Sequence, residues 1–464
     1  MLNTLKSSLI AIRSSLWFVP TLMVGGAVAL ALTLVQIDKH YAFNWATPYP
    51  LLFGAGAEGS RQMLSTIASS MITIAVLTFS LTIAALVTAS AQYTSRILRN
   101  FMRDRRNQVV LGSFVGIFTY CLVVLRTIRS GDEGAFVPSL AVFAGLLLAL
   151  LGIGVLVFFI HHIATSIQAS TIIASITGET LAAIDKRFPK NAKDRGNAGE
   201  DVMPVMSAMG VAVSHRQVVR SNTRGYVQNI DISGIVKLAV KYGAIVQVDV
   251  PPGGFVARHV RLLTITTECE LDDETLKALR DGISIRSFRT IDQEFGFGIR
   301  QLVDIALKAL SPGINDTTTA VMCVDHLAAI VMQIANRPMP VCHRSEDGVL
   351  RLALPGWSFD EIVETAFDQI RNNASGNVAI IEHLLGAISA SAEATNDDHR
   401  WDTLELHLGM VAAMAAKTVV TEHDRERIRV RFDDALDWCG QRRPPRSAAA
   451  PAVASSGTQP AQSS

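Results

Sequence analysis

The chain has 464 residues, of which 49% are hydrophobic and 18% are charged, and its formal net charge is +1. This composition is too apolar for an ordinary soluble protein and too charged for a bare membrane bundle, so we expect a membrane domain joined to water-soluble domains. The five cysteines form no Cys-x-x-Cys pair, which excludes a disulfide framework and the common zinc sites and suits a reducing cytoplasm.

Four apolar stretches without Lys, Arg, Asp or Glu fill the first third of the chain: Leu16–Ile37, Met63–Ala91, Val109–Leu125 and Phe136–Ile160. A bilayer core needs about 20 apolar residues per helix, so each stretch predicts a transmembrane helix. The first stretch also has a basic flank and an Ala-Leu-Ala sequence, as a cleaved signal peptide has. Its apolar run of about 22 residues exceeds the roughly 7–15 residues of a signal peptide, so we favour a retained anchor.

Basic residues flank these stretches unequally. The segment Tyr93–Asn107 carries five arginines against the single acid Asp104, whereas the other two loops are nearly balanced. Basic loops stay in the cytoplasm, and each cation beside an anionic leaflet gains about 1 kcal/mol. We therefore expect this segment to contact lipid headgroups, and both termini to lie on the cytoplasmic side of the inner membrane. The five arginines are Arg96, Arg99, Arg103, Arg105 and Arg106.

The second apolar stretch carries a line of hydroxyl side chains, formed by Thr66, Ser69, Ser70, Thr73 and Ser80. At about 100° per residue they fall within about 60° of one line along a helix. Two interpretations remain open. The one we favour is close helix packing, with the hydroxyls bonded to neighbouring backbone. The other is the wall of a polar path through an oligomer. The four stretches contain no acidic or basic residue, which disfavours a proton-coupled transporter.

Small residues recur in the third stretch, at Gly112 and Gly116, and in the fourth, at Gly145 and Gly152. Such residues let helices approach closely, so they indicate a compact bundle or a contact between copies. We expect a homo-oligomer in a bilayer that contains anionic lipid. The pair His161-His162 at the end of the fourth stretch suits an interfacial anchor better than a metal or pH-sensing site.

The fold class that follows is a membrane α-helical protein, with a four-helix transmembrane domain followed by a cytoplasmic α+β region. An amphipathic helix after the fourth stretch ends at Pro189, and a polar hinge follows it. We expect a transmembrane domain at 1–164, a helical linker at 165–200, a small β-rich domain at 201–290, a mostly helical domain with a β-hairpin at 291–440, and a disordered tail at 441–464.

The β-rich segment has recognisable local signals. Asp231 is a candidate N-cap for the helix Ile232–Tyr242, and Pro251–Gly254 separates two strands. The strand pattern resembles the barrel-sandwich hybrid of lipoyl and biotinyl carrier domains, but no lysine occupies the turn, so a carrier role has no support. Further along, Glu346–Gly348 predicts a hairpin turn, and Ser358 begins a capping box.

A turn between two helices is the candidate ligand site. The helix that precedes it bears Arg300 and Asp304, and the residues Ser311–Thr319 open the next helix. Asn315 and Asp316 are typical helix N-caps, and we favour capping alone. The other interpretation is an anion or ligand site lined by helix amides and by the hydroxyls of Thr317 and its neighbours.

Three segments resemble a bacterial family of predicted membrane proteins, domain of unknown function 2254. They are Tyr93–Arg106, Phe158–Gln168 and, most specifically, Phe297–Asp316. The similarity extends from the first apolar stretch to about Arg371. Thr317 departs from the family pattern, which often has Pro there, so the resemblance does not fix the geometry of this turn. The resemblance implies an inner-membrane location and no established activity.

Enzyme motifs do not occur in this sequence. There is no G-x-S-x-G, no H-E-x-x-H and no Walker loop. We therefore expect no catalytic site, cofactor, metal or nucleic-acid partner. The leading hypothesis is an oligomeric channel or conduit gated by its cytoplasmic domain, and the alternative is a membrane-anchored cytoplasmic sensor or scaffold with an unknown ligand.

Overall fold

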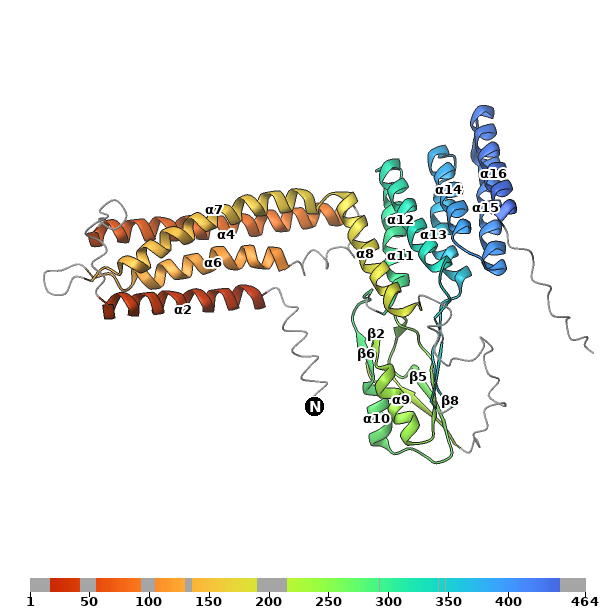
Figure 1. Cartoon of the computed structure of the whole chain (residues 1–464), viewed down its shortest axis with the longest axis horizontal. Coiled ribbons are helices and arrows are strands. Elements are labelled where there is room, and N and C mark those ends of the chain that lie inside the picture. The colour runs from red at the N-terminus through yellow and green to blue at the C-terminus, as the bar shows by residue number, and fades with distance from the viewer. Residues whose placement is uncertain are drawn as a thin grey trace, which may run out of the picture. The chain divides into compact units, whose positions relative to one another are not determined.

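The computed structural model of the chain describes residues 17–41, 56–92, 105–129, 136–189, 215–291, 293–340, 342–346 and 348–442 (Figure 1). The chain divides into two compact units, a first unit of Met1–Ile172 and a second unit of Ile173–Ser464. The four predicted apolar stretches fall in the first unit, and both β-sheets fall in the second.

The first unit is a bundle of four long helices in which α6 packs against the other three (Figure 1). Phe114 and Tyr120 of α6 are fully buried in its apolar core. At about 1.5 Å per residue, the 37 residues of α4 span about 55 Å, well beyond a bilayer core of about 30 Å. The helices are α2 (Phe18–Tyr41), α4 (Gly56–Gln92), α6 (Arg105–Leu125) and α7 (Ser139–Ser166).

The predicted small residues lie where these helices touch. A Cβ added to Gly112 would lie 2.7 Å from Met23 Sδ of α2, and one added to Gly145 would lie 2.8 Å from Leu64 Cδ2 of α4. Both distances are shorter than real Cβ atoms show, so a side chain at either position would force its neighbour to move. The glycines therefore serve the compact bundle, and a contact between copies would have to use another surface.

Asp38 holds two helices together at one end of the bundle. The sequence places it in the first loop, but it lies buried in the last turn of α2. Its carboxylate accepts hydrogen bonds from the amides of Leu140 (3.3 Å) and Ala141 (3.1 Å) at the start of α7. The first amides of a helix have no partner within it, so Asp38 caps α7 from a different helix.

The β-rich part of the second unit contains two sheets, a five-stranded sheet of order β1-β5-β3-β8-β7 and a three-stranded sheet of order β4-β2-β6. As predicted, Asp231 caps the helix that follows β2 and accepts a hydrogen bond from Gly234 N at 3.0 Å. The elements are β1 (His215–Arg220), β2 (Gly225–Ile230), α9 (Ile232–Lys241), β3 (Ile245–Val248), β4 (Phe255–Val256), β5 (Arg261–Thr267), α10 (Asp273–Asp281), β6 (Ile283–Arg286), β7 (His343–Glu346) and β8 (Val349–Ala353).

The predicted β-hairpin is confirmed, since β7 and β8 pair in antiparallel fashion. The sequence pattern assigns this hairpin to the same domain as the helices around it. Instead β8 lies parallel to β3, with Val246 opposite Leu352 and Gln247 opposite Ala353. The chain therefore returns to the β-sheet after two helices.

The remaining helices stack as three helical hairpins in two layers (Figure 1). One layer contains α11, α13 and α15, and the other contains α12, α14 and α16. Arg400 of α15 joins hairpins by donating to the carbonyls of Ile334, Ala335 and Arg337, at and beyond the end of α12, at 3.1, 2.9 and 2.8 Å. The helices are α11 (Phe295–Ala309), α12 (Thr317–Ala335), α13 (Phe359–Asn373), α14 (Val378–Glu393), α15 (Asp398–Thr418) and α16 (Glu422–Arg442).

Five of the described helices are long and apolar enough to cross a membrane. Four are the helices of the first unit, and the fifth is α12, in the second. Length and composition alone therefore do not confirm the predicted number of four spans.

Several elements of the second unit meet at the start of α11. A Cβ on Gly296 would overlap the Trp357 ring, and one on Gly298 would overlap Thr180 Oγ1 of α8 (Ala169–Arg187). Phe295, just before them, is buried, and its ring centroid lies 5.2 Å from that of Phe188 and 5.7 Å from that of Trp357. The Phe-Gly-Phe-Gly sequence therefore lets α11 approach two neighbours more closely than any side chain would allow.

This close approach generates a stability prediction. Gly298→Ala should destabilise the full chain in nanodiscs, because overpacking costs about 1–3 kcal/mol and the gain in helix propensity is at most about 1 kcal/mol. Gly409→Ala is the matched control, since a Cβ at this helical position meets nothing within 4 Å. Adding Thr180→Ala should restore part of the loss in the melting temperature. Equal melting temperatures for Gly298→Ala and Gly409→Ala would contradict this account.

Candidate functional site

The hydroxyl face of α4, namely Thr66, Ser69, Ser70, Thr73 and Ser80, is exposed on the outside of the bundle. It lies on the side of the helix opposite the buried residues Leu64, Ala68, Met71 and Ala75. Packing within one chain therefore does not account for it. Thr66, Thr73 and Ser80 donate to carbonyls four residues earlier in α4, at 2.8, 2.8 and 2.9 Å. Their acceptor lone pairs stay available to water, lipid or a second copy.

The predicted lipid-contact segment lies mostly outside the described residues, which include neither Arg96, Arg99 nor Arg103. Arg105 and Arg106 are the first two residues of α6, and both are exposed. Arg106 Nη1 lies 3.5 Å from Nδ1 of His162, which is buried near the end of α7 and stacks on Phe158. Arg106 therefore has a contact inside the bundle in addition to any contact with lipid.

The turn before α12 has the geometry of a helix cap. Asp316 accepts hydrogen bonds from the amide of Thr319 (3.0 Å) and from its hydroxyl (2.5 Å). These bonds hold the pKa of Asp316 below its usual value of 3.8. Asn315 has a left-handed backbone with φ 50°, a conformation that asparagine tolerates well. The Ser311 hydroxyl donates to Lys308 O at 2.7 Å. The predicted N-cap is thus present.

Two residues proposed for the same site lie away from it. At 1.5 Å per residue, Arg300 is about 16 Å and Asp304 about 10 Å along the helix axis from Ser311. Thr317, by contrast, contacts the N-terminus of another helix, because Asn377 Nδ2 donates a hydrogen bond to Thr317 Oγ1 at 3.2 Å. Asn377 is itself the N-cap of α14. The structure therefore joins two helix N-termini at this turn and leaves Arg300 and Asp304 outside that group.

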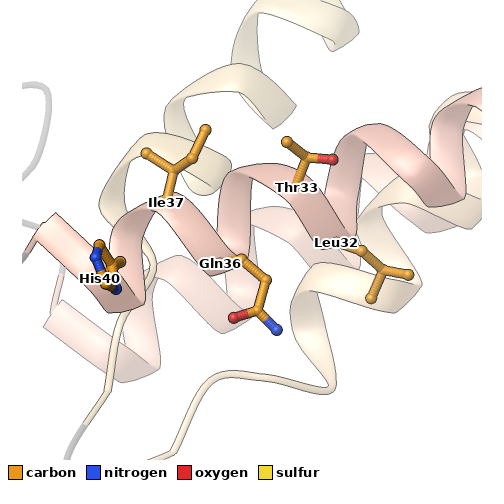
Figure 2. Close-up of a pocket in the computed structure, with 5 residues that line it drawn as sticks. All are labelled: Leu32, Thr33, Gln36, Ile37 and His40. Carbon is orange, nitrogen blue, oxygen red and sulfur yellow. The ribbon is translucent and has the colours of Figure 1, made fainter.

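An open hollow lies on the outer side of α2 (Figure 2). It is lined by Leu32, Thr33, Gln36, Ile37 and His40, all from this one helix. Thr33 donates to Ala29 O at 2.8 Å, so its hydroxyl hydrogen is already used. The hollow is an indentation of the bundle surface and does not enclose a ligand. In the part of the chain that the structure describes, no three His, Cys, Asp or Glu side chains gather as a metal site.

The cap geometry predicts what the turn does. Asp316→Ala should lower the free energy of unfolding by about 1 kcal/mol, whereas Asp316→Asn should lower it much less, because asparagine is an equally good N-cap. Since the folded-state pKa of Asp316 is depressed, its contribution is complete at neutral pH and is lost as the pH falls below 3.8. We expect no thermal shift of the wild-type chain with inorganic phosphate. A shift that both variants abolish would indicate a ligand site instead.

Comparison with known proteins gives the chain a family. Residues 13–390 match the family described as predicted membrane protein (DUF2254). The chain is 31% identical over 473 residues to uncharacterized protein Rv1290c of Mycobacterium tuberculosis (strain ATCC 25618 / H37Rv), and equally to uncharacterized protein Mb1321c of Mycobacterium bovis (strain ATCC BAA-935 / AF2122/97). These alignments cover 98% of this chain and 88% of each relative. No solved structure matches the chain. The protein therefore belongs to the predicted membrane protein family of domain of unknown function 2254.

Proposed function

We propose that four helices cross the inner membrane, namely α2, α4, α6 and α7, and that α12 does not. The observation that carries this is the parallel pairing of β3 with β8. One of these strands precedes α12 in the chain and the other follows it. If α12 alone crossed the bilayer, the two strands would lie on opposite sides and could not pair. Asp325, exposed near the middle of α12, would also be costly within the hydrocarbon.

Four spans place both ends of the chain on the same side, and the arginines before α6 favour the cytoplasm. Reporter fusions after Asn107 and Ala192 and at the C-terminus should all report a cytoplasmic location. Fusions near Glu58 and Asp132 should report the opposite side. The C-terminal fusion is the decisive one for α12, because a fifth span would move it across the membrane while leaving the fusion at Ala192 unchanged.

We propose further that copies associate through the hydroxyl face of α4 and form a channel or conduit. This face is exposed on the bundle, while Gly112, Gly116, Gly145 and Gly152 already face other helices inside it. Its flank is apolar and exposed, as at Val76 (61%) and Phe79 (53%). Hydroxyl oxygens bordered by lipid-compatible side chains suit a wall that meets water on one side and hydrocarbon on the other.

Gating by the second unit has a covalent route. Only Ile167 and Gln168 separate α7 from α8. Within the second unit α8 is fixed to the helical hairpins, since Asp185 pairs with Arg337 at 2.6 Å and accepts from Gln333 at 2.8 Å. A movement of the hairpins would therefore be passed to α7 through a two-residue link.

A second candidate function is a membrane-anchored sensor or scaffold. It is favoured by the stacked helical hairpins, since repeat proteins of this construction bind partners along extended surfaces. A scaffold needs no ion path, so conductance separates the two proposals.

We expect the full chain in planar bilayers to give discrete conductance steps. Ser70→Leu with Thr73→Leu should reduce the step size at unchanged reconstitution, whereas Val76→Leu on the apolar flank should not. In the same preparations, Thr73→Cys should add disulfide-linked dimers beyond those of the parent chain, and Val76→Cys should not. If the Thr73→Cys dimers form but no conductance is observed, the result favours the scaffold. If neither is observed, the proposed association of copies is wrong as well.

A further inference from the structure

Two chain segments that cross between the sheets lie side by side. One runs from β1 to β2 and the other from β4 to β5. Ser221 N donates to Val260 O, and His259 N donates to Ser221 O, both at 2.9 Å. At one end Arg220 pairs with Arg261, and at the other Tyr226 pairs with Phe255. We call this two-stranded element, formed by residues 220–226 and 255–261, the basic ribbon.

The basic ribbon carries a concentrated positive charge. Arg220, Arg224, Arg258 and Arg261 are all exposed. Residues 215–230 and 251–267, which contain the ribbon, include no Asp or Glu. Asp249 is a neighbouring acid, with Oδ2 lying 3.7 Å from Nε of Arg261. Among the described residues, Asp249 is the acid that forms an ion pair with one of these four arginines, so the ribbon is strongly cationic.

Exposed apolar side chains accompany this charge. Phe255 is 61% exposed, and its ring contacts that of Tyr226 edge to face at 5.2 Å between centroids. Tyr226 is also the register partner of Arg286 on β6, which lies beside β2 (Figure 1). Phe255, Tyr226 and Arg286 therefore form one cross-strand row on the same side of the three-stranded sheet. Val260, within the ribbon, is exposed as well (37%).

We propose that the basic ribbon docks the second unit onto an anionic phospholipid bilayer. Guanidinium groups bind phosphate oxygens through paired donors. Aromatic rings beside them are most favourable at the boundary between headgroups and hydrocarbon. The residues of this surface are different from those of the arginine segment before α6. The inference rests on the chain being membrane-anchored, and it holds whether or not the chain conducts ions.

Anchoring is the reason to choose a bilayer as the occupant. Because the spans tether the second unit to the membrane, lipid phosphates are always present at high effective concentration, and weak contacts suffice. A soluble anion would leave Phe255 in water, whereas the interface removes it from water. A single-stranded nucleic acid also offers phosphates and stacking bases, so the test includes it.

The experiment measures hydrogen–deuterium exchange in the full chain in two kinds of nanodisc. One contains phosphatidylcholine alone, and the other contains phosphatidylcholine with phosphatidylglycerol. We expect slower exchange in the loops Ser221–Arg224 and Ala257–Val260 in the anionic nanodisc. Arg224→Gln with Arg258→Gln should weaken docking, about fivefold for each charge removed, and restore the faster exchange. Concentrated salt should do the same.

The matched control is Lys237→Gln with Lys277→Gln, which removes the same charge from exposed positions on α9 and α10 and should leave the protection intact. Equal exchange in the two nanodiscs overturns the proposal. So does equal protection by glycerol phosphate or by a single-stranded oligonucleotide added to neutral nanodiscs. Both leaflets of a nanodisc have the same composition, so the outcome depends on neither the orientation of the chain nor its conductance.

Discussion

The second unit depends on one kind of contact, the packing of glycines against side chains at the start of α11. Gly298 admits Thr180 of α8, and Gly296 admits Trp357, which lies between β8 and α13. Glu294 is the residue just before α11, and its buried carboxylate accepts a hydrogen bond from Arg289 Nε at 3.0 Å. Removing either charged partner would leave the other buried and unpaired.

The β-rich part is tied to the same point. Gly253 has φ 83°, and a Cβ there would overlap the Glu294 carboxylate, so the residue must be glycine for two independent reasons. Gln293 exchanges hydrogen bonds with the backbone of Ile230 at the end of β2, at 2.9 and 3.3 Å. A displacement of α11 would therefore disturb its contacts with the sheets, with the hairpins and with α8.

The helical bundle of the first unit is held together by different contacts. Its helices are held by small residues and by one carboxylate, Asp38, at the amide end of α7. A hydrogen bond from Tyr120 to Ala141 O at 2.7 Å lies beside it. Gly112 and Gly116 of α6 and Gly145 and Gly152 of α7 all contact other helices of the bundle. What remains outside is the hydroxyl face of α4, whose donors largely bond within the helix, so the bundle is complete without a partner and still presents polar oxygens to one.

Much of this protein was determined by local sequence. Runs of apolar residues predicted the four long helices of the first unit, and capping residues such as Asp231, Asp316 and Ser358 predicted the starts of three helices, because both signals act over a few residues. The family resemblance likewise rested on contiguous motifs. Tertiary structure alone decided that Asp38 caps α7, that β8 joins β3, and that the hydroxyl face points away from its own bundle. Each of these depends on residues distant in sequence meeting in space, or on which side of a helix its neighbours cover, and no local pattern encodes either.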